Sequence, residues 1–170
     1  LIVGTQCHGL AIFNRTIKGE YKHSKNIVAP DRFGQGNISP VPLTPIGDGL
    51  PSNLINDILV TKNSVSQTIW IATSAGIVKM SNDFAKQEYW RGKDYADKVS
   101  RLYGGAPKDF KPAQSGLMNQ LYPEDYLTCL AEDENGQIWI GARRNGIMIY
   151  DPLSGKRQQG THKNYRVIII

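Results

Sequence analysis

The sequence predicts an all-β fold built from repeated antiparallel sheets, and two observations support this prediction. One apolar pattern, a short strand, a turn and a second short strand, occurs three times, at residues 1–13, 69–80 and 138–150. Each turn ends in a glycine, and these glycines are 67 and 70 residues apart, at Gly9, Gly76 and Gly146. Self-similarity at a nearly fixed period is the signature of a repeat architecture.

The copy nearest the C-terminus defines the start of the unit most clearly. A first strand at 126–132 is followed by a polar turn at 133–137 and by a second strand that contains Trp139. Asn135-Gly136 is a strong hairpin signal, because a type I′ turn requires positive φ at both central residues. We therefore predict a type I′ turn between these two strands.

The unit then continues to a third and a fourth strand. After the second strand the chain turns at 143–146 and enters a third strand at 147–150. The middle copy has the same order, with a first strand at 54–60 and a fourth strand at 86–91. We place the counterpart of that fourth strand at 17–22 in the first copy. Four antiparallel strands per repeat make a propeller blade.

The middle strands of the repeats are almost continuously apolar, without strict alternation. Strands that are covered on both faces have this pattern, and sheets stacked face to face contain such strands. We therefore assign Trp70 and Trp139 to the core between blades. Together the patterns predict an all-β chain that is a fragment of a β-propeller, with about two and a half four-stranded antiparallel blades and long inter-blade insertions.

The predicted insertions follow from the length of the repeat, which exceeds the roughly 40 to 50 residues of a compact blade. Within the second insertion, Tyr95, Val99 and Leu102 are spaced for one face of a short helix over 94–103. The predicted organisation is a blade remnant at 1–23, an insertion at 24–48, a blade at 49–91, an insertion at 92–125 and a blade at 126–170.

Composition and motifs exclude several classes of function. The 170 residues carry a net charge of +5 on scattered lysines and arginines, so we expect no nucleic-acid partner. We expect Cys7 and Cys129 to be free thiols. No His or Cys pair has metal-ligand spacing, and no phosphate loop or nucleophile elbow occurs, so we predict no metal, no cofactor and no catalytic residue. Residue 1 lies inside a repeat and residues 167–170 read as part of a strand, so we expect a piece of a longer chain.

Four short motifs resemble the two-component regulator propeller repeat. They are Gly49-Leu50-Pro51-Ser52-Asn53, Asn135-Gly136-Gln137-Ile138-Trp139-Ile140-Gly141, Gly146-Ile147 and Tyr150-Asp151. The resemblance implies a seven-bladed propeller in the extracytoplasmic, periplasmic sensing region of a hybrid two-component system histidine kinase. It also implies an oligosaccharide ligand, the remaining blades of the parent chain as partners, and a dimer of the parent.

Propeller geometry predicts where a ligand would bind. The turn between the second and third strands of a blade lies on the same face as the connection to the next blade. Binding residues concentrate on loops that a rigid scaffold positions. The turns at 6–8, 74–75 and 143–145 should therefore share a face with both insertions. The candidate ligand-binding residues are Arg143, Arg144, Asn145, His8, Trp90 and Tyr95.

Each of these candidates has a functional and a structural interpretation. Arginine offers paired, planar donors that suit a carboxylate or sulfate group, whereas Arg143 and Arg144 as plain turn charges would only be solvated. The aromatic faces of Trp90 and Tyr95 can stack on sugar rings, and the alternative is that they hold an insertion on its own blade. His8 can contact the ligand, and the alternative is that it is a solvated histidine of the turn.

The leading hypothesis for function is a non-enzymatic sensor. One alternative is a catalytic propeller acting on polysaccharide, a lyase or glycosidase, which requires paired carboxylates or a His/Tyr pair near the axis. This segment supplies no convincing pair. The other alternative is a structural interaction propeller of a secreted lipoprotein. Two open blade faces further predict that the segment, taken alone, associates through them.

Overall fold

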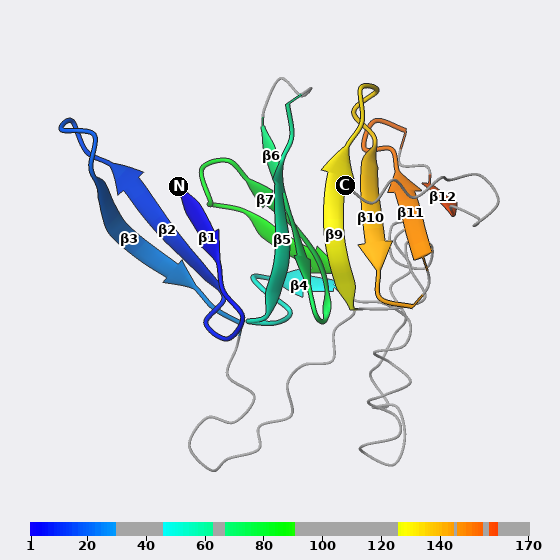
Figure 1. The fold of residues 1–170 in the computed structure, drawn as a ribbon, viewed down its shortest axis with the longest axis horizontal. Coiled ribbons are helices and arrows are strands. Elements are labelled where there is room, and N and C mark those ends of the chain that lie inside the picture. The colour runs from blue at the N-terminus through cyan, green and yellow to red at the C-terminus, as the bar shows by residue number, and fades with distance from the viewer. Residues whose placement is uncertain (30–45, 63–66, 91–125, 145, 155–156, 160–170) are drawn as a thin grey trace, which may run out of the picture.

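The structure, a computed structural model, describes residues 1–29, 46–62, 67–90, 126–144, 146–154 and 157–159. Within these ranges the fold is all-β, with twelve strands in three antiparallel sheets. The sheets stand side by side, each presenting one face to its neighbour (Figure 1). The prediction of a β-propeller fragment is confirmed, and the sheets are named blades 1, 2 and 3 in chain order.

Blade 1 has three strands, in the order in which they occur in the chain. These are β1 (Ile2–Gly4), β2 (Leu10–Arg15) and β3 (Tyr21–Ile27). The predicted strand at 17–22 is wrong, because residues 16–20 form the turn between β2 and β3. Its hydrogen bonds run from the Thr16 N–H to the Glu20 carbonyl and from the Gly19 N–H to the Thr16 carbonyl. Ile17, which suggested a strand, is exposed at the tip of this turn.

Blade 2 contains the predicted four-stranded meander and one further strand. Its strands are β4 (Ile46–Asp48), β5 (Ile55–Val60), β6 (Thr68–Thr73), β7 (Gly76–Ser81) and β8 (Gln87–Trp90). The spatial order is β4-β8-β7-β6-β5, so β4 lies outside the fourth strand of the meander. Ile46 pairs directly with Trp90, at the end of the predicted first insertion.

Blade 3 is a complete four-stranded meander with the order β12-β11-β10-β9. Its strands are β9 (Leu127–Glu132), β10 (Ile138–Ala142), β11 (Gly146–Tyr150) and β12 (Arg157–Gln159). The register pairs Trp139 with Ile149 across β10 and β11.

The turn between β9 and β10 differs from the predicted type I′ turn. Gly136 has a φ of 75°, but Asn135 is outside the positive region. The Gly136 N–H donates to the Asp133 carbonyl, and the Asp133 N–H donates to the Gln137 carbonyl, both at 3.1 Å. The Asp133 carboxylate accepts the N–H groups of Asn135 and Gln137, both at 2.9 Å. The aspartate therefore organises a longer turn in which only the glycine needs positive φ.

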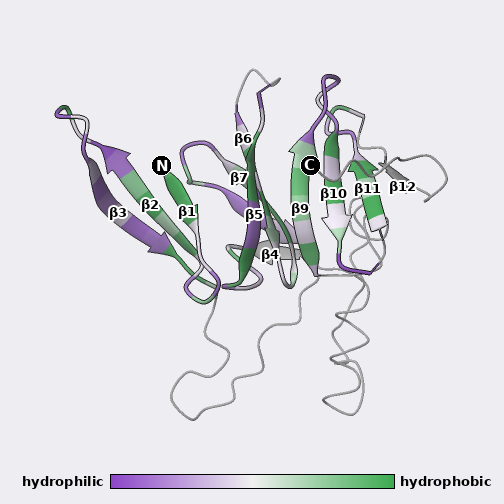
Figure 2. Ribbon diagram, viewed as in Figure 1, coloured by the Kyte–Doolittle hydropathy of each residue, from purple (hydrophilic) through white to green (hydrophobic). Residues whose placement is uncertain are grey.

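Two apolar clusters fill the spaces between the blades. The cluster between blades 1 and 2 contains Leu10, Ile12, Ile27, Leu50, Ile55, Ile69, Ile71, Val78, Met80 and Tyr89. The cluster between blades 2 and 3 contains Trp70, Ala72, Ile77, Trp90, Leu127, Ile138, Ile140, Met148 and Tyr150. Alternate residues of β6 therefore enter different clusters, which explains its uninterrupted apolar sequence. Figure 2 shows the contrast between the hydrophilic β3 and the hydrophobic β11.

The two repeat tryptophans lie in different surroundings. Trp70 is 1% exposed and belongs to the cluster between blades 2 and 3. In β10 that cluster receives Ile138 and Ile140, so Trp139 between them lies on the opposite face of blade 3. Trp139 is half-buried, and its indole N–H donates to the Asp133 carboxylate at 3.0 Å.

Polar contacts also join the first strands of blades 2 and 3. The Asn56 amide donates to the Leu127 carbonyl at 2.5 Å. The Leu130 N–H donates to the Asp57 carboxylate at 2.7 Å. Because these backbone groups lie on the free edge of β9, side chains of blade 2 provide partners that a neighbouring strand would otherwise supply.

Candidate functional site

Three turns lie together at one end of the blades, which we call the loop face. They are the β1–β2, β6–β7 and β10–β11 turns, all at the lower end of the blades in Figure 1. The strands that lead to the predicted insertions end there too. Ile27 of β3 pairs with Leu10 beside the first turn, and Trp90 of β8 pairs with Ile77 beside the second.

The β1–β2 turn is fixed by its own hydrogen bonds and by blade 2. The Thr5 hydroxyl donates to the Gly9 carbonyl at 2.9 Å, and the Gly9 N–H donates to the Asn53 carbonyl at 3.0 Å. Gly9 has a φ of 68°, and a Cβ at this position would lie 2.3 Å from the Ile27 carbonyl oxygen. Only glycine fits here, so the turn is a rigid part of the loop face.

The other two turns dock in one repeated manner. The Ser74 N–H donates to the Leu54 carbonyl at 3.2 Å in blade 2, and the Arg143 N–H donates to the Tyr126 carbonyl at 3.0 Å in blade 3. In each blade the turn is thus bonded to the residue that precedes the first strand. Loops held in this way keep their side chains in defined positions.

Blade 3 supplies the cationic part of the loop face. Arg143 and Arg144 are both exposed, and the guanidinium carbon of Arg143 lies 5.1 Å from the centre of the Tyr126 ring. A guanidinium over an aromatic face is held by a cation–π attraction and keeps its N–H donors free to bind at its edge. The corresponding residues of blade 2 are Ser74 and Ala75, which carry no charge.

The remaining sequence candidates are not all on this surface. His8 is exposed in the β1–β2 turn. Trp90 is 4% exposed, and its ring stacks on Trp70 with centroids 6.4 Å apart, so the structure places it in the core between blades. Asn145 and Tyr95, and the helix predicted over 94–103, lie outside the described residues.

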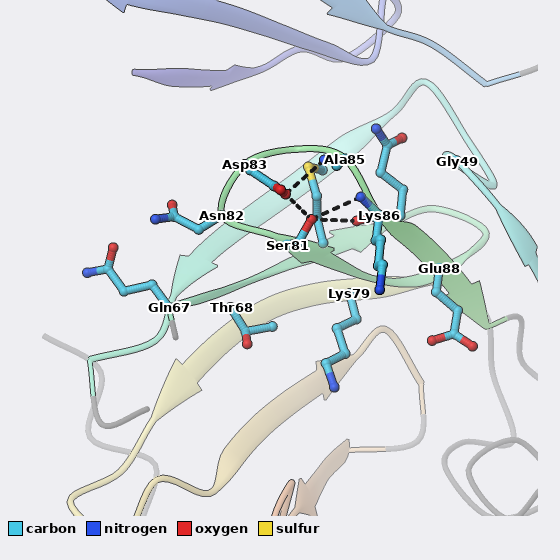
Figure 3. Close-up of a pocket in the computed structure, with 12 residues that line it drawn as sticks. Gly49, Gln67, Thr68, Lys79, Ser81, Asn82, Asp83, Ala85, Lys86 and Glu88 are labelled. Carbon is cyan, nitrogen blue, oxygen red and sulfur yellow. Dashed lines mark hydrogen bonds between the residues drawn. The ribbon is translucent and has the colours of Figure 1, made fainter. Parts of the chain in front are cut away.

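A groove that the sequence did not reveal lies on blade 2, at the end opposite the loop face. It has a volume of about 1030 Å³. Its polar lining includes Gln67 and Thr68 at the start of β6, and Lys79, Lys86 and Glu88 around the β7–β8 turn (Figure 3). The available signal was Lys79, a charge inside the apolar run of β7, but its partners depend on strand register.

The side chains that commonly bind metal ions are dispersed over the described residues. Among them, no three His, Cys, Asp or Glu side chains are grouped to hold a metal ion. Cys7 and Cys129 are free thiols, both exposed. In this same part of the chain, no helix has the length and apolar character needed to cross a bilayer.

The comparisons with known proteins agree with the strand pattern of blade 3. Residues 122–144 match the family model described as two component regulator propeller. Within the described residues this stretch contains β9, the Asp133 turn and β10. No curated protein matches the chain.

Proposed function

Because the chain carries a two component regulator propeller repeat, we propose that it is part of the extracytoplasmic ligand-sensing propeller of a hybrid two-component regulator. The proposed ligand is an oligosaccharide, and the proposed receiver of the signal is a histidine kinase. Propellers of this family are generally sensor or structural domains and are not catalytic. They are typically extracellular or periplasmic.

The observation that carries the proposal is the arginine pair on the loop face. Arg143 rests on the Tyr126 ring, and its turn is bonded to the backbone before β9. Such an arginine presents planar paired donors, which suit the carboxylate of a uronic acid or the sulfate of a sulfated sugar. The site therefore favours an acidic oligosaccharide.

The same contacts provide a route from ligand to blade packing. The Arg143 turn is bonded to Tyr126, and Leu127, the next residue, accepts the amide of Asn56 from blade 2. A ligand that shifts the turn would change the position of β9 against blade 2. Contacts of this kind can transmit a signal between sites when they have two alternative arrangements.

Isothermal titration of the full-length protein with acidic oligosaccharides tests the proposal. Oligogalacturonates and heparin-derived disaccharides are suitable probes. We expect at least one to bind, and the double variant Arg143→Met, Arg144→Met to weaken that binding about tenfold or more, since each hydrogen bond to a charged group contributes about 1.5–3 kcal/mol.

Arg15→Met is a matched control, because Arg15 is also exposed but lies at the opposite end of blade 1, on β2. It should leave binding unchanged. If no acidic probe binds, or if the double variant binds as the wild type does, the proposed site is wrong.

A further inference from the structure

The face of blade 2 that is turned toward blade 3 changes character along its length. Strand register places Ala72, Ile77 and Trp90 in one row near the loop face. The next row along the strands contains Trp70, Lys79 and Glu88, and beyond it lie Thr68 and Ser81.

Blade 3 covers only the apolar half of this face. Ala72, Ile77 and Trp90 are buried in the cluster shared with blade 3. Lys79 and Glu88 are exposed, although the two neighbours of Lys79 in β7, Val78 and Met80, are buried. The polar half lines the groove of about 1030 Å³, and Figure 3 shows Thr68, Lys79 and Glu88 projecting to the same side of the sheet.

The aromatic ring beside Lys79 is buried and does not line the groove. The Lys79 ammonium nitrogen lies 5.8 Å from the centre of the Trp70 ring. Trp70 also meets Tyr150 of blade 3 edge-on, with centroids 5.7 Å apart, and its side chain is 1% exposed. Burial raises the pKa of the Tyr150 hydroxyl, and the nearby Asp151 and Glu88 carboxylates raise it further. Trp70 therefore supports Lys79 and offers no open ring face.

The rim of the groove is a rigid turn. The Asp83 carboxylate accepts hydrogen bonds from the Ser81 hydroxyl and the Ala85 N–H, and these bonds lower the pKa of Asp83. Phe84 has a φ of 60°, a conformation that non-glycine residues rarely adopt, and its ring packs against the cluster between blades 1 and 2. A strained residue held by packing is typical of preorganised functional turns.

We propose that this groove is a second binding site, which takes a neutral saccharide. The ammonium groups of Lys79 and Lys86 are balanced by the carboxylates of Asp83 and Glu88, so the lining carries no excess charge to attract a phosphate or a polyanion. The covered Trp70 offers no surface on which a nucleobase could stack.

Paired donors and acceptors remain, and they match sugar hydroxyl groups, which both donate and accept. Lys79 lies directly opposite Glu88 in the register, so their Cβ atoms are about 4.5–5.5 Å apart. Gln67 and Thr68 add an amide and a hydroxyl to the lining. A volume of about 1030 Å³ lies at the upper end of the usual range for ligand sites, which suits a short oligosaccharide.

Isothermal titration of the full-length protein with maltotriose, cellotriose, xylotriose and mannotriose tests this proposal. We expect at least one of these neutral sugars to bind. Lys79→Met and Glu88→Gln should each weaken that binding about tenfold. Lys79→Met removes a charged donor, and Glu88→Gln replaces a charged acceptor by the weaker, neutral amide oxygen. Lys22→Met, at an exposed lysine of β3 in blade 1, should leave it unchanged.

Lys79→Met also removes the contact with Trp70, so a thermal melt of each variant separates loss of binding from loss of folding. Glu88→Gln keeps the shape of the side chain. If Lys79→Met lowers the melting temperature, the affinity of Glu88→Gln for the sugar tests the proposal instead. Binding of none of the four sugars, or unchanged affinity in a variant that keeps its melting temperature, would overturn the proposal.

The groove and the loop face can be tested independently. The double variant at Arg143 and Arg144 should lose acidic probes and keep the neutral sugar. Lys79→Met should do the reverse. A failure of the proposed sensor site therefore leaves the result for the groove intact.

Discussion

The carboxylate of Asp57 and the backbone N–H of Leu130 are joined by a 2.7 Å hydrogen bond that crosses from blade 2 to blade 3. The other oxygen of the same carboxylate accepts the N–H of Ile58 at 2.8 Å. The Asp57 side chain thus binds a backbone N–H of its own strand next to the register shift between Ile55 and Asp57, and it also binds the edge of the next blade. Blade 3 has Cys129 at the place that corresponds to Asp57.

Replacing Asp57 should weaken the contact between the two blades. Asp57→Ala leaves the half-buried Leu130 N–H without its acceptor, and we expect a loss of about 1–3 kcal/mol in the free energy of unfolding. Asp57→Asn keeps an acceptor oxygen and should lose less. Urea denaturation of the full-length protein measures both. Equal effects of the two variants would show that the hydrogen bond is not the cause.

Trp70 should be among the most costly core residues to truncate. Its side chain is 1% exposed and contacts Trp90 and Tyr150. Trp70→Ala should reduce the free energy of unfolding by about 3–5 kcal/mol. Leu153→Ala serves as control, because Leu153 is 94% exposed and its loss should change stability by less than about 0.5 kcal/mol. A loss below about 1 kcal/mol for Trp70→Ala would contradict this assignment of the core.

Gly9 should tolerate alanine less well than Gly19. Both have positive φ, at 68° and 83°, so both substitutions incur about 1–2 kcal/mol of backbone strain. At Gly9 the new Cβ would also meet the Ile27 carbonyl at 2.3 Å, whereas at Gly19 the nearest atom is an Arg15 guanidinium nitrogen at 3.8 Å. Thermal melts should show the larger decrease for Gly9→Ala. Similar decreases would mean that the backbone moves to relieve the contact.

Acid should weaken the β9–β10 turn through Asp133. The Trp139 indole and the backbone N–H groups of Gln137 and Asn135 hold the pKa of Asp133 below its ordinary value of 3.8. Because the folded-state pKa is the lower one, the stabilisation is present above about pH 3.8 and is lost as the pH falls through the folded value.

Melting temperatures between pH 6 and pH 2.5 measure this effect. Asp133→Asn should be less stable than the wild type at pH 6, and the difference should shrink at the acid end. Glu134→Gln, at the exposed neighbouring residue, should follow the wild-type curve. A difference that stays constant with pH would rule out the ionised carboxylate as the source.

The meanders could be predicted because they are local. The β6–β7 and β10–β11 pairs follow from apolar segments joined by short glycine turns, and neighbouring strands then pair in sequence order. The position of β3 could not be read in the same way. Ile17 is apolar, but the positive φ of Gly19 and the hydrogen bonds of Thr16 make that segment a turn.

The remaining features depend on contacts between residues distant in sequence. β4 has only three residues, and nothing in the local sequence indicates that it pairs with β8. The face on which Trp139 lies depends on which blade covers Ile138 and Ile140. The groove needs the register that sets Lys79 opposite Glu88. Charge and residue type alone predicted a ligand site at Arg143 and Arg144 and not at the groove. An arginine in a turn can be recognised in the sequence, whereas a cross-strand pair cannot.

The fifth strand of blade 2 makes this blade wider than its neighbours. β4 adds one strand spacing, about 4.8 Å, beyond β8. Among the described residues, β3 and β12 have no such strand outside them. Within the described residues, the outer edge of blade 2 therefore lies one strand farther from β5 than a four-stranded meander would place it.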